Sequence, residues 1–259
     1  MGSHASIKDI LEAYRHGLVS LDEAEKRVMG LTIETVRDIA QLDIGRDIRC
    51  GIPEIILAEG KNPKDLVSIA LQCTKTQGRC IISRVQKEHV DAIHEALKDK
   101  ELSILDIESA GIIILSDGSQ PLHHRGTVGI LCAGTADIRV AEEARIVASE
   151  MGCSVKKAYD VGVAGIHRLF SALKEMTDAD VFVVVAGREG TLPAIVAGII
   201  DKPVIGVPVS TGYGYMGKGE AALASMLQSC SILAVVNIDA GVIAGAFAAR
   251  IAKMVANYD

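Results

Sequence analysis

Aromatic side chains are scarce in this 259-residue chain, which has no tryptophan, three phenylalanines and five tyrosines. Proteins that bind single-stranded nucleic acid stack bases on aromatic rings and follow the phosphate backbone with lysine and arginine. The formal net charge is −6, and no stripe of basic residues is interleaved with aromatic ones. We therefore expect no nucleic-acid partner.

Paired metal-binding cysteines are also missing, because none of the six cysteines has CxxC spacing. They are Cys50, Cys73, Cys80, Cys132, Cys153 and Cys230. His123 and His124 are adjacent, so on an extended segment they point to opposite sides, and no cysteine or carboxylate stands near them at ligand spacing. No secretory signal precedes the first predicted helix. These absences predict a cytoplasmic protein with reduced thiols, no metal site and no tightly bound cofactor.

The chain also lacks a long apolar run free of charge. Its most apolar window, residues 232–249, contains Asn237 and Asp239 and is followed by Arg250. A charge near the middle of a membrane span is costly in lipid. We therefore expect no membrane-spanning segment.

What the chain has in quantity is hydrophobic residues, at 49%, and 25 glycines. Two short amphipathic helices are predicted at 6–16 and 21–29, the second opened by Ser20 with Glu23 three residues on. Strand and helix patterns then alternate from residue 55 to 115, which predicts a small α/β domain. A polar linker at 116–125 separates it from the rest, so we expect domains at 1–122 and 123–259.

Four basic residues of the first domain are candidates for binding anionic substrate groups. Arg46 and Arg49 lie in a charged loop with glycine and proline, where their planar guanidinium groups could clamp a phosphate or carboxylate. A solvated ion-pair loop explains them equally well. Lys61 and Arg84 lie in two strand-to-helix turns that we expect to open on the same sheet edge.

The second domain shows five apolar, mostly β-branched strands, each followed by a segment of helical length. They are residues 128–132, 154–159, 181–185, 204–207 and 234–238. Such alternation predicts a doubly wound parallel sheet with right-handed crossovers. Ligands in that architecture bind beyond the carboxyl ends of the strands, so we expect the chemistry in the five loops that follow them.

The first two loops combine glycine with polar residues. Gly134 and Thr135 could hold a phosphate on backbone N–H groups, while Asp137 binds a ribose hydroxyl or the reacting ring. Asp137 could instead only cap its helix. In the second loop, Gly165 precedes His167, a candidate proton carrier or packed histidine, and Arg168, a candidate anion clamp.

The remaining loops offer further candidates. Glu189 lies between Gly187, Gly190 and Thr191 at a helix start, and as a general base it would need a raised pKa. The fourth loop is long and glycine-rich and holds Tyr213 and Gly214, which is typical of a mobile lid. The last loop begins with two polar residues, Asn237 and Asp239.

Several of these segments resemble one family. They are similar to the LarB family of pyridinium-3,5-biscarboxylic acid mononucleotide synthases. The segments are ILCAGTADIRVAEEA, YDVGVAGIHRL, VVAGREGTLPAIVAG, DKPVIGVPVSTGYG and VVNIDAGVIAGAFAA, together with LDIGRDIRCGIPEIILAEGKN. The resemblance covers nearly the whole chain. It implies a flavodoxin-like fold, similar to aminoimidazole ribonucleotide carboxylase, with a smaller α/β domain before it.

The resemblance also implies an activity. Nicotinic acid adenine dinucleotide would be carboxylated by carbon dioxide on its pyridinium ring, and its phosphoanhydride cut to release AMP, for nickel-pincer cofactor synthesis. Cys230, in the LQSC segment, would be the nucleophile facing a pocket lined by Gly134 and Glu189. Glu189 would remove the ring proton, with Asp137 and His167 in supporting acid/base roles.

Two other functions stay open. Phosphoribosylaminoimidazole carboxylase, which the second domain also resembles, carries a histidine where this chain has Thr191. A non-catalytic nucleotide-binding regulator would use the same glycine loops. The final helix, apolar on several faces, and the resemblance predict a homo-oligomer, with an octamer as one form. Assistance by a divalent ion such as Mg²⁺ is left open.

Overall fold

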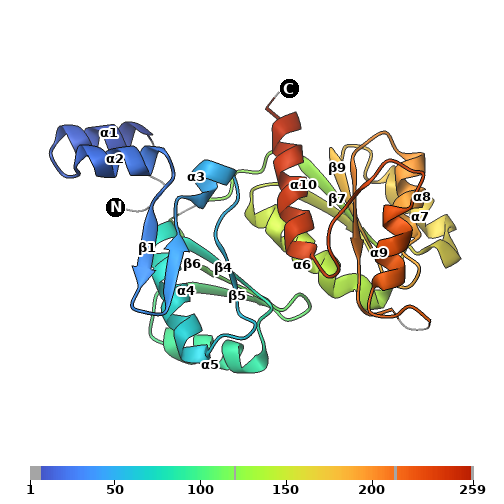
Figure 1. The fold of residues 1–259 in the computed structure, drawn as a ribbon, viewed down its shortest axis with the longest axis horizontal. Helices are drawn as coiled ribbons and strands as arrows, with labels where there is room; N and C mark the ends of the chain where they lie inside the picture. The colour runs from blue at the N-terminus through green and yellow to red at the C-terminus, as the bar shows by residue number, and fades with distance from the viewer. Residues whose placement is uncertain (1–6, 120, 213–214, 258–259) are drawn as a thin grey trace. The chain divides into compact units, whose positions relative to one another are not determined.

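The computed structural model describes residues 7–119, 121–212 and 215–257. The chain divides into two compact units, Met1–Pro121 and Leu122–Asp259. Each has a sheet of its own (Figure 1). Within the described ranges no helix is long and apolar enough to cross a membrane.

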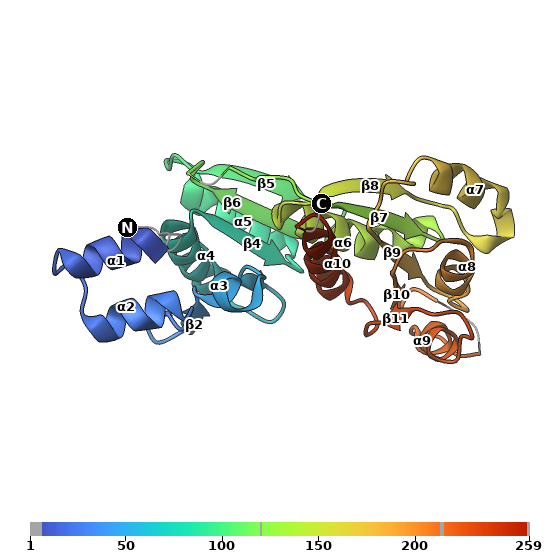
Figure 2. The same ribbon diagram turned by 90° about the horizontal axis from the view of Figure 1, so that it is seen from above.

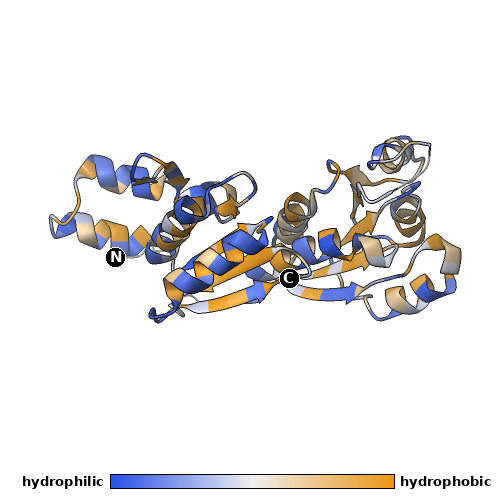
Figure 3. Ribbon diagram, turned by 90° about the horizontal axis from the view of Figure 1, so that it is seen from below, coloured by the Kyte–Doolittle hydropathy of each residue, from blue (hydrophilic) through white to orange (hydrophobic). Residues whose placement is uncertain are grey.

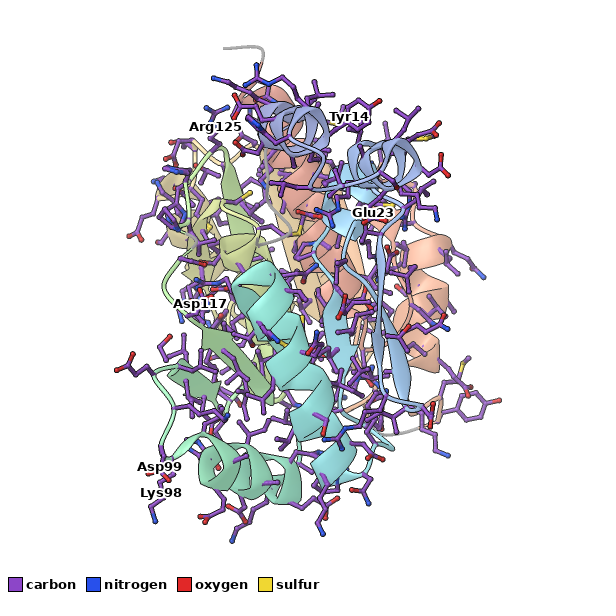
Figure 4. The ribbon with its side chains drawn as sticks, turned by 90° about the vertical axis from the view of Figure 1, so that its left-hand side faces the viewer. Tyr14, Glu23, Lys98, Asp99, Asp117 and Arg125 are labelled. Carbon is purple, nitrogen blue, oxygen red and sulfur yellow. The ribbon has the colours of Figure 1, made fainter. Side chains whose placement is uncertain are left out.

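The N-terminal unit begins with a pair of helices, α1 (Ile7–Arg15) and α2 (Leu21–Val28). Ser20 caps α2 as predicted, because its hydroxyl accepts a hydrogen bond from the N–H of Glu23 at 3.2 Å. Tyr14 and Glu23 project from this pair in Figure 4. A hairpin of β1 (Ile33–Val36) and β2 (Ala40–Asp43) follows. Part of the predicted charged loop forms a short helix, α3 (Arg46–Cys50). The sequence did not predict these three elements.

The main sheet of this unit has the order β3-β4-β6-β5. Its strands are β3 (Ile55–Leu57), β4 (Arg79–Ser83), β5 (Ser103–Ile107) and β6 (Ile112–Ser116), and its helices are α4 (Pro63–Gln77) and α5 (Lys87–Leu97). The parallel pair β3 and β4 brings both strand-to-helix turns to one edge, as expected. The other two pairings are antiparallel, so the unit is a mixed α/β domain.

The C-terminal unit contains one parallel sheet with the order β11-β10-β9-β7-β8. Its strands are β7 (Thr127–Cys132), β8 (Ser154–Ala158), β9 (Val181–Ala186), β10 (Val204–Pro208) and β11 (Ala234–Val235). Counted along the chain the spatial order is 2-1-3-4-5, which is the flavodoxin-like arrangement. The predicted doubly wound fold is confirmed, although the fifth strand is only two residues long.

Helices cover both faces of this sheet. On one face, α6 (Ile138–Glu150) packs against α10 (Gly241–Val255). On the other lie α7 (His167–Lys174), α8 (Leu192–Ile199) and α9 (Glu220–Leu227), around a core that includes Leu131, Phe182 and Leu192. Figure 2 shows the two layers on either side of the strands, and Figure 3 shows the hydrophobic colouring concentrated in the strands.

Glycine sets how closely α6 and α10 approach. A Cβ on Gly241 would lie 2.3 Å from the carbonyl oxygen of Val140, and one on Gly245 would lie 2.3 Å from that of Ala144. Both contacts are with helix backbone, which cannot swing aside. The close pairing of these helices therefore depends on the absence of side chains at two positions one turn apart.

Candidate functional site

The carboxyl edge of the C-terminal sheet holds the candidate site. The strand order reverses between β7 and β9, and in such sheets ligands bind beside the loops that follow the strands at this switch point. The first is Ala133–Asp137, which contains the 3₁₀ turn η1 (Thr135–Asp137), and the second is Gly187–Thr191. The predicted loop residues Gly134, Asp137 and Gly187 are brought together there.

Unusual backbone conformations gather at the same edge. Six non-glycine residues of the described ranges have positive φ, and four of them lie in the loops that follow β8, β9, β10 and β11. These four are Asp160 (56°), Arg188 (48°), Lys218 (56°) and Asp239 (56°). Such conformations cost free energy and persist where the surrounding structure enforces them, which is common at functional sites. This clustering marks the edge independently of any motif.

Asp137 is the buried carboxylate at the switch point, with 5% of its surface exposed. Its Oδ2 accepts a hydrogen bond from the N–H of Gly134 at 2.9 Å, and its Oδ1 accepts one from the hydroxyl of Thr211 at 3.4 Å. The backbone of Gly187 also hydrogen-bonds this carboxylate, and a Cβ on Gly187 would come within 3.0 Å of Oδ1. Asp137 thus joins the loops after β7, β9 and β10.

The protonation of Asp137 reflects two opposed effects. Burial raises its pKa above the ordinary aspartate value, and the hydrogen bonds from Gly134, Gly187 and Thr211 lower it but do not cancel the burial effect. A buried carboxyl with a raised pKa at a switch point is suited to moving a proton or orienting a cationic group. The bond from Gly134 is the capping contact that the sequence left open, and the bonds from Gly187 and Thr211 add to it.

The loop after β10 is fixed on both sides. The N–H of Val209 donates to the carbonyl of Ala186 on the β9 side at 3.2 Å, and the N–H of Ser210 donates to Oδ1 of Asp239 on the β11 side at 2.9 Å. Gly212 packs against the backbone of Arg188, where a Cβ would lie 3.0 Å from its nitrogen. Tyr213 and Gly214, two predicted substrate contacts, lie outside the described residues.

The loop after β8 places Arg168 beside Asp160, with which it forms an ion pair. The guanidinium of Arg168 lies over Gly165, where a Cβ would be 2.8 Å from both Nε and Nη2. Gly165 therefore makes room for the arginine. His167 is the exposed first residue of α7. An anion bound by Arg168 would have to compete with Asp160.

The loop after β9 presents Glu189 to solvent, with 60% of its side chain exposed and Oε2 3.9 Å from Nε of Arg188. In this form the carboxylate is therefore open to solvent and is not enclosed in a site. A bound ligand or a neighbouring chain would have to cover it. Gly190 is held against α9, since a Cβ would lie 2.7 Å from Cα of Ala222.

Cys230 lies at the opposite edge of the sheet. α9 carries the chain from the carboxyl end of β10 back towards the amino end of β11, and Cys230 stands between these two elements. The neighbouring Ser231 is close to Gly198 in α8, with Oγ 3.7 Å from where a Cβ would be. The strands separate the two edges by about 15 Å. This corrects the expectation that one chain brings Cys230 to the pocket lined by Gly134 and Glu189.

Most of the basic residues of the N-terminal unit that were predicted to bind the substrate are paired with acidic side chains. Arg46 pairs with Glu54 at 3.1 Å, and Arg49 pairs with Asp43 at 2.5 Å and also donates to the carbonyl of Gly30. The ion pair between Arg84 and Glu59, 2.9 Å long, joins the two strand-to-helix turns. The side chain of Lys61 is exposed. The ion-pair explanation left open by the sequence fits Arg46 and Arg49 in this form.

A cavity of about 650 Å³ also lies in the N-terminal unit, between α2, β1, α3 and α4. None of the four predicted basic contacts lines it. In the described ranges no group of three His, Cys, Asp or Glu residues could hold a metal ion.

Two features of the site were not predicted. Thr211 bonds Asp137 from a loop that the sequence marked only as a glycine-rich lid. Glu142 on α6 is buried and accepts hydrogen bonds from Arg145, Lys157 and Tyr159, the residue that precedes Asp160. The sequence spacing of Glu142, Lys157 and Tyr159 does not indicate that they are in contact. They meet only because β8 lies beside β7, with α6 packed over both strands.

Comparison with known proteins agrees with this architecture. A family model described as LarB/PurE-like N-terminal domain matches residues 33–115, and one described as AIR carboxylase matches residues 127–258. An uncharacterized protein of Methanocaldococcus jannaschii is 41% identical over 255 residues, which is 96% of this chain and 98% of that protein.

Shorter matches are to proteins named as mutases. An N5-carboxyaminoimidazole ribonucleotide mutase of M. jannaschii is 34% identical over 43% of this chain and 69% of the relative. Its counterpart in Thermotoga maritima is 33% identical over 32% of this chain and 50% of the relative. These relatives support an enzyme of the carboxylase or mutase type. The chain belongs to the LarB family, with a LarB/PurE-like N-terminal domain followed by an AIR carboxylase domain.

Proposed function

We propose that the protein carboxylates the pyridinium ring of nicotinic acid adenine dinucleotide with carbon dioxide and cleaves the phosphoanhydride to release AMP. The product would be pyridinium-3,5-biscarboxylic acid mononucleotide. The observation that carries the proposal is the buried carboxylate of Asp137 at the switch point, next to Gly134 and Gly187, which have no side chains. A cationic ring is a suitable neighbour for such a carboxylate.

The chemistry requires a nucleophile. A pyridinium ring is electron-poor and cannot attack carbon dioxide. A thiolate that adds to the ring carbon next to the reacting carbon forms a C–S bond and a neutral enamine, whose β-carbon then bonds to carbon dioxide. A base removes the proton from that carbon, the C–S electron pair returns to the thiolate, and aromaticity is restored. Cys230 is our candidate for the thiolate and Glu189 for the base.

Because Cys230 lies at the far edge of its own sheet, its role requires a second copy of the chain. Cys230 is exposed and has exposed apolar neighbours in Leu227 and Ile232. The outer face of α10 is also apolar and exposed at Ile243 and Phe247. These surfaces suit subunit contacts, which would bring the thiol of one chain to the carboxyl edge of another and cover Glu189. The number of subunits stays a prediction.

The polyanionic substrate needs cations. In the C-terminal unit the candidate is Arg168, which lies beside Gly165. In the N-terminal unit the candidates stay those predicted from the sequence, Arg46, Arg49, Lys61 and Arg84. Four of the five are paired with carboxylates, so a phosphate would have to displace Asp160, Glu54, Asp43 or Glu59. Mg²⁺ on the pyrophosphate would supply the same neutralisation.

The second candidate is carboxyl transfer on aminoimidazole ribonucleotide, which the mutase names of the shorter relatives favour. That reaction moves a proton, and the carboxylases of this type carry a histidine where this chain has Thr191. Thr191 cannot serve as a proton carrier at neutral pH. We therefore rank this reaction second.

A direct comparison of substrates tests the proposal. The protein is incubated with bicarbonate and either nicotinic acid adenine dinucleotide or aminoimidazole ribonucleotide, and the products are separated by chromatography. We expect AMP and a carboxylated mononucleotide from the first and no turnover of the second. Turnover of aminoimidazole ribonucleotide alone would establish the second candidate, and binding of either without turnover would point to a regulator.

Mixed variants test the shared site. Cys230→Ser and Asp137→Asn should each be inactive, but the two chains expressed together should recover activity, because some sites then combine an intact Cys230 with an intact Asp137. The control is a chain that carries both substitutions. It should stay inactive when it is expressed without either single variant. No recovery in a mixed oligomer would contradict a site shared between chains.

A further inference from the structure

We propose that Asp239 is a positioning residue, which sets the orientation of the Asp137 carboxylate through the backbone of Ser210 and the hydroxyl of Thr211. The proposal deepens the proposed function, since it rests on the role of Asp137 at the reacting ring. It replaces the substrate contact that the sequence predicted for Asp239.

Asp239 holds the end of β10 at two points. Its own N–H donates to the carbonyl of Pro208 at 2.9 Å, and its Oδ1 accepts the N–H of Ser210 at 2.9 Å. These two bonds tie the loop after β11 to the end of β10 and to the residues that follow it. The backbone of Asp239 has a φ of 56°, a conformation that aspartate and asparagine tolerate better than most residues.

The segment that Asp239 holds leads directly to Asp137. Thr211 follows Ser210, and its Oγ1 donates to Oδ1 of Asp137 at 3.4 Å. On the other side, Val209 is tied to Ala186 of β9. Displacement of Ser210 therefore moves Thr211, while the anchor at Val209 stays in place.

The predicted consequence concerns the proton on Asp137. The hydrogen bond from Thr211 favours the charged carboxylate. If Asp239 no longer holds Ser210, that bond weakens and Asp137 takes up its proton at higher pH. The loss of one hydrogen bond of ordinary strength corresponds to an upward shift of about half a pH unit or more.

Four substitutions separate the contributions. Asp239→Gly keeps the positive φ without strain and removes the acceptor, whereas Asp239→Asn keeps both an acceptor oxygen and the tolerance for positive φ. Thr211→Val removes the donor and Thr211→Ser keeps it. The ionisation of Asp137 is followed in the full-length, ligand-free protein by ¹³C NMR of labelled aspartate carboxyl groups, with Asp137→Asn used to assign the signal.

We expect Asp239→Gly and Thr211→Val each to raise the titration midpoint of Asp137, and Asp239→Asn and Thr211→Ser to leave it within about 0.2 units of wild type. Adding Asp239→Gly to Thr211→Val should cause no further shift, since the first acts through the second. An unchanged midpoint in Asp239→Gly, or the same added shift in the Thr211→Val background, would overturn the proposal.

The measurement does not depend on the substrate. If nicotinic acid adenine dinucleotide proves not to be carboxylated, the titration still decides whether Asp239 acts on Asp137. If the titration fails while carboxylation is observed, the proposed function stands and only the role of Asp239 is withdrawn.

Discussion

Glu142 offers the clearest energetic prediction in the C-terminal unit. Its carboxylate is buried and accepts hydrogen bonds from Arg145 at 2.8 Å, Lys157 at 3.0 Å and Tyr159. Burial would raise the pKa of Glu142, but these three partners outweigh it and lower the pKa to about 2, from an ordinary value of 4.5. The network ties α6 to β8 and to the start of the loop that carries Asp160 and Arg168.

The shift can be converted into a stability. A depression of 4.5 − 2 = 2.5 units corresponds to about 3 kcal/mol. Lys157 is half-exposed, so solvent screening reduces this to roughly 2 to 3 kcal/mol. Because the pKa is lower in the folded state, the stabilisation is fully present above pH 4.5 and is lost as the pH falls from 4.5 towards 2. By pH 3 about half of it should be gone.

The test is Glu142→Gln, which keeps an acceptor oxygen and removes the charge. Urea unfolding of the C-terminal unit is followed by hydrogen-exchange mass spectrometry of peptides within residues 138–158, at pH 7, 4 and 3. We expect the variant to be less stable by roughly 2 to 3 kcal/mol at pH 7 and by about half as much at pH 3. Glu175→Gln, at an exposed position, is the control and should change little.

A deficit of Glu142→Gln that stays the same from pH 7 to pH 3 would refute this reasoning. It would mean that the side chain stabilises the unit by packing alone. A deficit that grows as the pH falls would contradict the direction of the pKa shift.

Two further predictions concern packing and catalysis. Gly245→Ala should destabilise the C-terminal unit by about 2 kcal/mol or more in thermal unfolding, since its Cβ would lie 2.3 Å from the carbonyl of Ala144. Gly198→Ala, whose Cβ would meet nothing closer than 3.7 Å, should instead gain up to about 1 kcal/mol, and equal losses in both would contradict the close-packing argument. Asp137→Asn should lower kcat/KM at least about 100-fold. In the wild type kcat/KM should rise with pH through a midpoint above the ordinary aspartate value, and a midpoint at or below it would argue against Asp137 as the group observed.

The parts of the fold that depend on local pattern could be predicted from the sequence. The strands of the C-terminal sheet are continuous apolar runs such as 181–186, and strict alternation with helices permits few topologies. The β1–β2 hairpin was missed because each strand has four residues, with only Val36 and Leu42 buried. The short helix α3 was missed because its charged sequence RDIRC also fits a loop.

The site could be predicted only as a set of loops. Asp137 was ranked below Glu189, since the sequence does not reveal that Asp137 is buried and Glu189 exposed. The distance of Cys230 from these residues depends on the direction in which α9 runs, and its proposed partners lie in another chain. Networks such as Glu142 with Tyr159, or Asp239 with Ser210, join residues far apart in sequence.

The most direct test of the account is to detect the bond between sulfur and the substrate ring. The protein is mixed with nicotinic acid adenine dinucleotide and bicarbonate, so that the reaction can reach the proton-removal step, and is examined by mass spectrometry under non-denaturing conditions, followed by mapping of the modified peptide. We predict an added dinucleotide on Cys230, more of it in Glu189→Gln, where proton removal is blocked, and none in Cys230→Ser. Full carboxylation by Cys230→Ser, with no adduct on the wild type, would contradict the central claim that a cysteine activates the ring.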